Sequence, residues 1–383
     1  MKKVLILTLL AIFAVSLTFM GIGCKEEVAE TTAAETTAAE TTAAETTAAE
    51  ETEAEVEETE AEEEGPLKIY YVASDTTTHP FWRSQAESMA DYAEELGVDL
   101  TILDAGNDTE QQTSQVETVV TQKPDAVIYC AVDTGVGVSH IAMMKEAGIP
   151  VVNNNRQVPE GTYDIQFAFN EVNGGATSAE LVVDFLTEKY GEPKGKILEM
   201  QGALTDENSV LRSQGFYSVT DQYEDVMVLT RNTAWDLNKS ASEALDAYQA
   251  NPDIDAIYLQ SDYLLPTILN IIEDKPQVGE EGHIYVISLS GDSLAVSLIR
   301  DKIIDCSLNM DVIQMALIAL DFAIGLTEGV VPEVGSMIGE GEPWGPVEVM
   351  PAEGGGVQME LKEYPITLEN VDDPNLWGNQ YEL

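Results

Sequence analysis

The chain is poor in basic residues, histidine and cysteine, and each shortage excludes a class of function. It has 18 Lys and Arg against 69 Asp and Glu, which gives a formal net charge of −51. A chain this acidic repels nucleic acid and anionic membrane surfaces. We therefore expect neither as a direct partner. The three histidines and three cysteines form no cluster at metal-ligand spacing, so we expect no metal and no other cofactor.

Catalytic motifs are missing as well. The sequence has no Gly-x-Ser-x-Gly, no P-loop and no His-Glu-x-x-His, so we expect a protein that is not an enzyme. The cysteines, Cys24, Cys130 and Cys306, are too few for a disulfide framework. If Cys24 is modified, one pair remains possible, but two buried free thiols are the favoured interpretation.

The N-terminus has the pattern of an export signal. Lys2 and Lys3 precede an uncharged, mostly apolar run that ends in Gly21-Ile22-Gly23-Cys24. This ending resembles a bacterial lipoprotein signal, although Gly21 stands where such signals usually have Leu. The resemblance implies a signal peptide over residues 1–23, lipid on Cys24 and an extracytoplasmic protein held to the cell membrane. An uncleaved membrane anchor is the alternative, because an apolar run of about 20 residues can span a bilayer.

Residues 24–66 are expected to form a disordered acidic tether. Residues 31–50 are four copies of Thr-Thr-Ala-Ala-Glu, and residues 51–64 are almost all Glu, Ala and Thr. Such a segment cannot bury enough apolar surface to offset the entropy lost on ordering, and its like charges repel one another. Partial helix is the alternative, since Ala and Glu favour helices.

The remaining residues alternate between short apolar strands and amphipathic helices. This alternation predicts βαβ units, and its length predicts two lobes, so the expected fold is α/β with two doubly wound parallel sheets and a ligand cleft between them. Strands are expected at 68–72, 99–103, 126–130, 150–152, 196–200, 226–230, 255–259 and 284–289. Helices are expected at 81–96, 109–122, 136–146, 209–223, 238–250, 264–273, 292–300 and 311–326.

Several short motifs between residues 67 and 328 together resemble the periplasmic sugar-binding proteins of the ribose/galactose type, which serve ABC importers. The motifs are His79-Pro80-Phe81-Trp82, residues 103–108, 147–153, 211–216, 251–256 and 260–262, and the tail 366–378. The resemblance implies a monomer with a three-strand hinge, crossing near Phe169, near Ser307 and after Gly335. The lobes would then be 67–168 plus 310–334, and 169–309 plus 335–383.

The resemblance also implies a ligand site. Phe81, Trp82 and Trp235 stand at the family's stacking positions, and aromatic rings suit the apolar faces of a sugar. Arg156 and Arg212 stand where the family uses arginine for sugar hydroxyls, because a planar fork donates to paired oxygens.

Six further site positions depart from the family pattern. They are His79, Cys130, Asn155, Ser261, Ser290 and Asn309. Asn155 and Ser290 replace acids, so both arginines are expected to lack counter-charges. A sugar acid, a sugar phosphate or a less polar polyol is therefore expected, while an aldose remains possible if Asp133, Asp206 or Asp262 supplies the missing acid.

The sequence therefore predicts an extracytoplasmic solute-binding lipoprotein that captures a sugar-like molecule and delivers it to an ABC transporter permease. A ligand-sensing subunit of the same fold, which would report to a membrane receptor, is the alternative.

Overall fold

The computed structural model describes residues 65–380. The predicted signal peptide, Cys24 and most of the predicted tether lie outside the described residues. Within residues 65–380, no helix has both the length and the apolar character needed to cross a bilayer.

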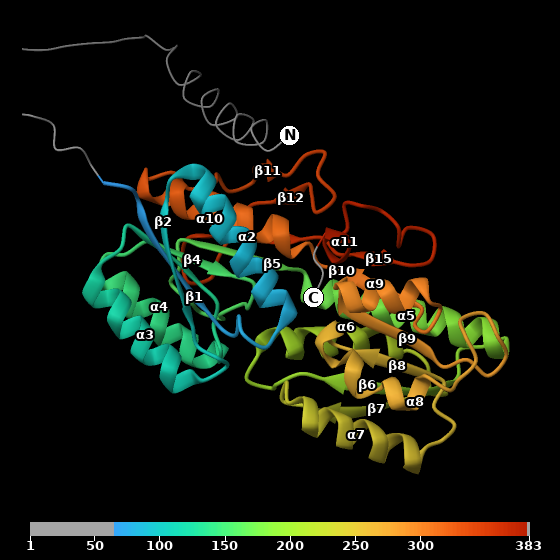
Figure 1. Cartoon of the computed structure of the whole chain (residues 1–383). Coiled ribbons are helices and arrows are strands. Elements are labelled where there is room, and N and C mark those ends of the chain that lie inside the picture. The colour runs from blue at the N-terminus through green and yellow to red at the C-terminus, as the bar shows by residue number, and fades with distance from the viewer. Residues whose placement is uncertain (1–64, 381–383) are drawn as a thin grey trace, which may run out of the picture. The chain divides into compact units, whose positions relative to one another are not determined.

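The first lobe is built on a seven-stranded sheet in the order β13-β14-β5-β4-β3-β1-β2. Its strands β1, β2, β4 and β5 are labelled in Figure 1. All neighbouring strands are parallel except β13 and β14. The central strands are buried along their whole length, as expected for a parallel sheet with helices on both faces. The strands are β1 (Lys68–Ala73), β2 (Asp99–Asp104), β3 (Ala126–Tyr129), β4 (Val151–Asn154), β5 (Ile165–Phe169), β13 (Met350–Pro351) and β14 (Val357–Leu361), and the helices are α2 (Pro80–Leu96), α3 (Thr109–Gln122), α4 (Thr134–Glu146) and α10 (Val312–Thr327).

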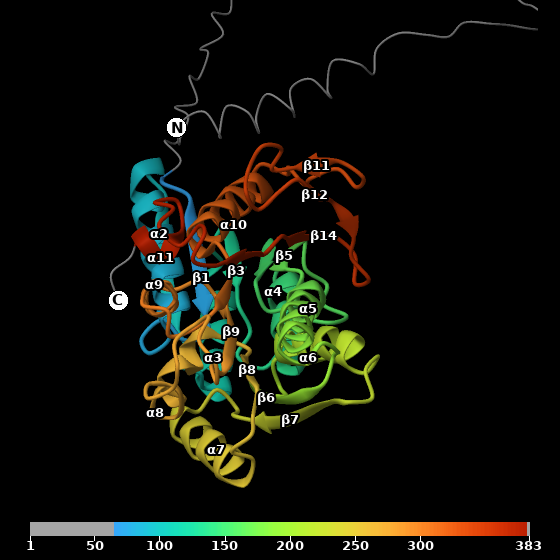
Figure 2. The ribbon, with the colours of Figure 1, turned by 90° about the vertical axis from the view of Figure 1, so that its right-hand side faces the viewer.

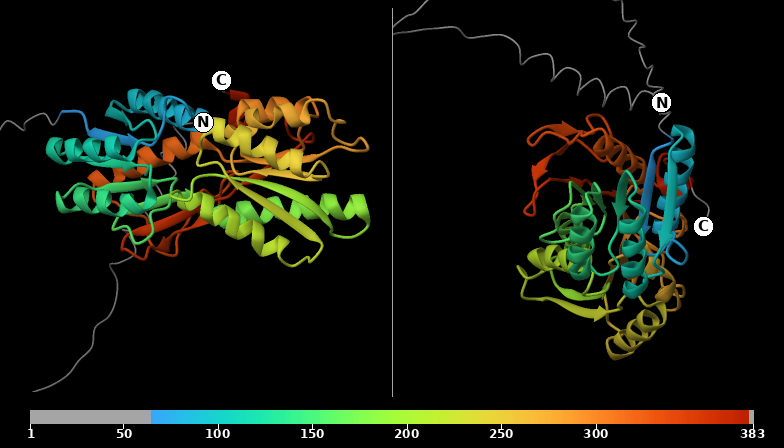
Figure 3. Two further views of the ribbon diagram at one scale, coloured as in Figure 1. Left: turned by 90° about the horizontal axis from the view of Figure 1, so that it is seen from below. Right: turned by 90° about the vertical axis from the view of Figure 1, so that its left-hand side faces the viewer.

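The second lobe has a six-stranded sheet in the order β15-β10-β9-β8-β6-β7, in which only β15 is antiparallel to its neighbour. Its strands are β6 (Gly195–Gln201), β7 (Val226–Asn232), β8 (Ala256–Leu259), β9 (Tyr285–Ser290), β10 (Cys306–Asn309) and β15 (Tyr364–Ile366). Its helices are α5 (Glu171–Tyr190), α6 (Glu207–Thr220), α7 (Leu237–Ala250), the 3₁₀ helix η1 (Asp262–Thr267), α8 (Leu269–Ile272), α9 (Ser293–Arg300) and α11 (Trp377–Gln380). The two sheets confirm the predicted α/β class, and the lobes lie side by side (Figure 3).

Three segments of the chain connect the lobes. The first lies between β5 and α5, at Asn170, and the second lies between β10 and α10, at 310–311. The third was expected after Gly335 but lies at 362–363, because β14 still pairs with β5 in the first sheet. Residues 335–361 therefore belong to the first lobe. The short strands β11 (Met337–Ile338) and β12 (Val347–Glu348) form a hairpin in this segment, near α10 (Figure 2).

Two helical predictions need correction. The expected helix at 264–273 is divided into η1 and α8, because Pro266 lacks the amide that a continuous α-helix needs. The 20-residue helix α5 was not predicted at all. It begins Glu171-Val-Asn-Gly-Gly, a start that is typical of a turn.

Candidate ligand site between the lobes

A small cavity lies between the lobes, at the carboxyl ends of the parallel strands, where ligands bind in sheets of this kind. Its volume is about 30 Å³, and one water molecule needs roughly 10–15 Å³ by this measure. The lobes are therefore closed directly on each other. The lining residues are His79, Phe81, Trp82, Asn155, Arg156, Asp206, Asn208, Arg212, Trp235, Ser261, Ser290 and Met310.

Direct hydrogen bonds between the lobes accompany this closure. The amide of Thr134 donates to the carbonyl oxygen of Thr205 at 3.0 Å. The Asn208 side-chain amide donates to Oδ1 of Asn155 at 3.1 Å. These contacts join the start of α4 and the loop after β4 to the start of α6, so they hold together the two walls of the cavity.

Phe81 and Trp82 occupy the first turn of α2, which begins with Pro80. Their rings meet edge to face with centroids 4.9 Å apart, and each residue is 5% exposed. Phe81 also meets Trp377 edge to face, with centroids 6.1 Å apart. Phe81 therefore contacts the second lobe as well as the cavity, whereas Trp82 is available as an aromatic wall.

Trp235 forms the aromatic wall on the second lobe. It has a positive φ of 58°, and its ring lies against the backbone of Gly202, where an added Cβ would come within 2.1 Å of a ring carbon. Only glycine at position 202 leaves space for this ring. The indole Nε1 donates to Oδ2 of Asp206 at 3.0 Å, which fixes the ring orientation.

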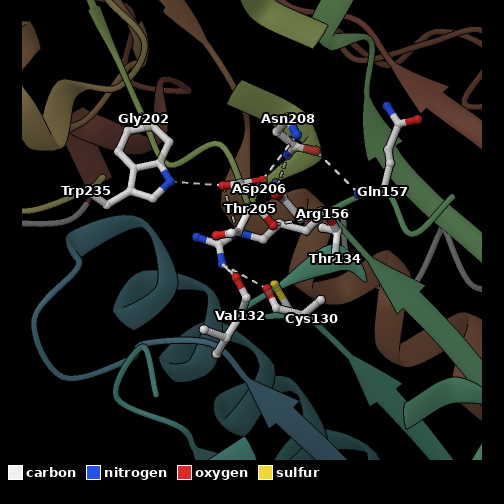
Figure 4. Close-up of polar contacts among 12 residues, drawn as sticks. Cys130, Val132, Thr134, Arg156, Gln157, Gly202, Thr205, Asp206, Asn208 and Trp235 are labelled. Atoms are coloured by element: carbon white, nitrogen blue, oxygen red, sulfur yellow. Dashed lines mark hydrogen bonds and ion pairs between the residues drawn. The ribbon is translucent and has the colours of Figure 1, made fainter. Parts of the chain in front are cut away.

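Arg156 follows β4 and reaches across the cleft (Figure 4). One terminal nitrogen donates to the carbonyl oxygens of Ala131 and Val132 at 2.8 and 2.9 Å, so its own lobe fixes the guanidinium. The Nε lies 3.0 Å from Oδ2 of Asp206 in the second lobe. The guanidinium carbon also lies 5.6 Å from the centroid of Trp82, within the range of a cation–π interaction.

Arg212, in α6, pairs with an acid of its own lobe. Its Nε lies 2.5 Å from Oε2 of Glu171, and a terminal nitrogen donates to the carbonyl oxygen of Gln260 at 2.7 Å. Burial alone would lower the pKa of Arg212, but the Glu171 carboxylate outweighs burial and raises that pKa. Arg212 therefore stays charged. Asn208 donates to the other oxygen of Glu171 at 2.8 Å.

The expectation that both arginines lack counter-charges is wrong. Asp206 faces Arg156, and Glu171 faces Arg212, so two cations meet two carboxylates. Of the acids considered from the sequence, Asp206 reaches the cavity. Asp133 caps α4, and Asp262 is buried in the second lobe, where it accepts from the amide of Asp292. The argument for an anionic ligand thereby loses its basis.

The structure places nine of the eleven predicted ligand contacts around the cavity. Cys130 and Asn309 lie outside this lining, buried behind it at the ends of β3 and β10. Cys130 and Cys306 are free, as predicted, and burial raises the pKa of the Cys130 thiol to about 11. No group of three or more His, Cys, Asp or Glu in the described part of the chain could hold a metal ion.

Sequence reasoning missed Asn208, Met310 and the supporting Glu171. The run Thr205-Asp206-Glu207-Asn208 does carry a recognisable signal, because Asp is a preferred N-cap and Glu favours the first turn of a helix. Met310 follows β10 directly at the second crossing. Glu171 is the first residue of the unpredicted helix α5, so nothing local marked it.

The fold and this site define a class: an α/β protein of two lobes with a candidate ligand cavity in the cleft between them. The chain belongs to the family of the periplasmic binding protein domain, whose model matches residues 69–329. It is 28% identical over 228 residues to the ribose import binding protein of Bacillus subtilis, covering 59% of this chain and 71% of that protein.

Other relatives point the same way. The chain is 29% identical over 195 residues to the D-apiose import binding protein of Actinobacillus succinogenes, covering 50% of this chain and 61% of that protein. A solute-binding protein of an ABC transporter from Bacillus halodurans C-125, solved with bound myo-inositol, has the same fold. It superposes with a TM-score of 0.66 at 21% identity, covering 83% of this chain and 99% of that one.

Proposed function

We propose that this protein captures a small, uncharged sugar or polyol outside the cytoplasm and delivers it to the permease of an ABC transporter. The observation that carries the proposal is the charge balance of a cavity walled by Trp82 and Trp235. Aromatic walls suit the C–H faces of a sugar, and paired charges suit hydroxyls, which both donate and accept. The names of the relatives, which include import proteins for ribose and D-apiose, support the same class.

Binding requires the lobes to separate first, because a cavity of about 30 Å³ is far smaller than a monosaccharide. Separation breaks the contact between Arg156 and Asp206. Each partner stays fixed in its own lobe, Arg156 by the carbonyl oxygens of Ala131 and Val132, and Asp206 by the Asn208 amide and the Trp235 indole. Both groups are thus preorganised for hydroxyls, and a ligand that touches both lobes shifts the population toward a closed form.

A calorimetric titration series tests this ligand class. D-Ribose, D-apiose and myo-inositol are compared with D-ribonate and D-ribose 5-phosphate. We expect tight binding of at least one neutral compound and much weaker binding of both anions. Tighter binding of an anion, or no binding across a wider panel of sugars and polyols, would contradict the proposal. Recovery of the bound compound unchanged after long incubation supports a binding role, whereas its steady conversion would indicate an enzyme.

We also propose that the mature protein is a monomer anchored through lipid on Cys24. The Gly21-Ile22-Gly23-Cys24 ending after an apolar run supports this. Mass spectrometry of the native protein should find a diacylglyceryl-modified Cys24 as the N-terminal residue. An unmodified Cys24 within an intact N-terminus would contradict it and favour the uncleaved anchor.

A further inference from the structure

One aromatic contact crosses the cleft beside the ligand cavity. The ring of His79, in the first lobe, stacks on the ring of Tyr263, in the second lobe, with centroids 4.4 Å apart and planes inclined by 21°. His79 lines the cavity, whereas Tyr263 does not. Tyr263 therefore contacts a lining residue without lining the cavity itself.

The first lobe holds His79 on a well-anchored loop. Asp75 accepts hydrogen bonds from the amides of Thr77 and Thr78 at 3.2 and 2.9 Å, and Asp104 accepts from the amide of Thr76 at 3.0 Å. His79 itself is the N-cap residue of α2, and its carbonyl oxygen accepts from the amide of Arg83 at 3.0 Å. The backbone of His79 is thus fixed, and the orientation of its ring depends on what packs against it.

The imidazole has unused hydrogen-bonding capacity. Its Nδ1 is buried and has no partner among the described residues. Burial, with the nearby charges of Arg156 and Arg212, lowers the pKa of His79 to about 3, so the ring is neutral at physiological pH. A neutral ring stacks on tyrosine and can also exchange a hydrogen bond with a ligand hydroxyl.

We propose that Tyr263 is a positioning residue for ligand recognition, which stacks on His79 across the closing cleft and sets the imidazole against the ligand only in the closed form. The proposal rests on the proposed function and adds Tyr263 to it. Tyr263 is the second residue of the 3₁₀ helix η1 in the second lobe, directly after Ser261 and Asp262. Closure of the lobes therefore brings its phenol ring to His79. When the lobes separate, the stack breaks, and the imidazole keeps the tilted contact with Trp82 of its own lobe, at a centroid distance of 6.1 Å.

The experiment compares Tyr263→Phe, which keeps an aromatic ring, with Tyr263→Ala, in the full chain. The probes for binding are D-ribose and myo-inositol, titrated by calorimetry. We expect Tyr263→Ala to weaken binding by about 3- to 10-fold, the scale of an aromatic pair, and Tyr263→Phe to stay within about 2-fold of wild type. In a His79→Ala background, Tyr263→Ala should cause no further loss, because its effect passes through His79.

A second measurement reports on the stack itself and is made with and without a bound sugar. The chain has three histidines, so the ring signals of His79 can be assigned in an NMR spectrum by their loss in His79→Ala. Stacking on Tyr263 should shift these signals upfield in wild type and in Tyr263→Phe, and Tyr263→Ala should remove the shift. An unshifted His79 signal in wild type, both alone and with a sugar that binds, would overturn the proposal. Absence of binding across the wider panel of sugars and polyols would instead refute the proposed function. Unchanged affinity in Tyr263→Ala, or equal loss in both variants, would also overturn the proposal for Tyr263.

Discussion

Arg156 and Arg212 are both buried and each pairs with one carboxylate, yet the two pairs have different positions relative to the hinge. Arg156 meets Asp206 across the cleft, whereas Arg212 meets Glu171 inside the second lobe. Opening the lobes breaks the first pair and leaves the second intact. The comparison indicates that the first pair belongs to the binding cycle and that the second supports the wall of the site.

The largest effect is expected for Arg212→Met. Glu171 is fully buried, and removal of its cation leaves its carboxyl without a charge partner. We expect the free energy of unfolding to fall by about 3–5 kcal/mol, as for other broken buried pairs. Urea denaturation followed by circular dichroism measures this. Arg300→Met is the matched control, because its pair with Asp372 is exposed and should be worth at most about 1 kcal/mol.

Arg156→Met should separate binding from stability. Removal of this guanidinium should weaken binding of a neutral sugar by about 2–5 kcal/mol, because Asp206 then closes on the ligand without its charge partner. The free energy of unfolding should fall clearly less than in Arg212→Met, since each lobe keeps its own sheet and core. Calorimetric titration and urea denaturation of the two variants make the comparison. Equal losses of stability would remove the distinction between the pairs.

The sequence predicted the positions of both arginines because each lies in a short motif. Arg156 follows a strand, as expected, whereas Arg212, which was expected at a helix start, lies in the second turn of α6. It did not predict their partners. Glu171 is 41 residues from Arg212, and helix packing alone brings the two together. The same packing explains why α5 was missed. An added Cβ at Gly175 would come within 2.0 Å of the Arg212 carbonyl oxygen, and one at Gly215 within 2.0 Å of the Val172 carbonyl oxygen.

Gly175 lowers the intrinsic helix propensity of α5 and Gly215 that of α6, but together they let the two helices approach closely, so tertiary packing overrides the local signal. The third crossing was misplaced for a related reason. The pairing of β14 with β5 joins segments far apart in the chain, and its alternating Val357-Gln-Met-Glu-Leu361 pattern does not say which sheet it joins. Strand and helix rhythm was therefore predictable, whereas contacts between elements were not.

The two tryptophans sharpen the comparison with a smaller effect. Trp235→Ala should weaken binding by about 1–3 kcal/mol and leave stability nearly unchanged, because the ring is only partly buried on its lobe. Trp82→Ala should lose similar affinity but also some stability, since Trp82 packs on Phe81 and is 5% exposed. Calorimetry and thermal denaturation of both variants test this. Unchanged affinity in Trp235→Ala would exclude its ring from the ligand site.

The smallest effect concerns an acid at the hinge that has no arginine of its own. Glu363 lies at the third crossing, and among the described residues neither of its buried side-chain oxygens has a hydrogen-bond partner. Burial raises the pKa of Glu363 well above its usual value, and the nearby Glu171 raises it further, while Arg212 opposes both. Glu363 is thus protonated in the folded protein at pH values where it is ionised in the unfolded chain.

A raised folded-state pKa means that the folded protein holds a proton that the unfolded chain releases. The stability contributed by this proton is complete below the ordinary carboxyl pKa of about 4.3 and is lost as the pH rises through the folded-state pKa. The side chain introduced by Glu363→Gln cannot ionise, so this variant should not show this loss. Measured relative to wild type, its free energy of unfolding should be about 1 kcal/mol higher at pH 8 than at pH 5. Urea denaturation at both pH values measures the difference, with the exposed Glu353→Gln as the control. If Glu363→Gln and wild type lose the same stability between pH 5 and pH 8, Glu363 is not the hinge acid that holds the proton, and Glu171 or Glu360 becomes the candidate.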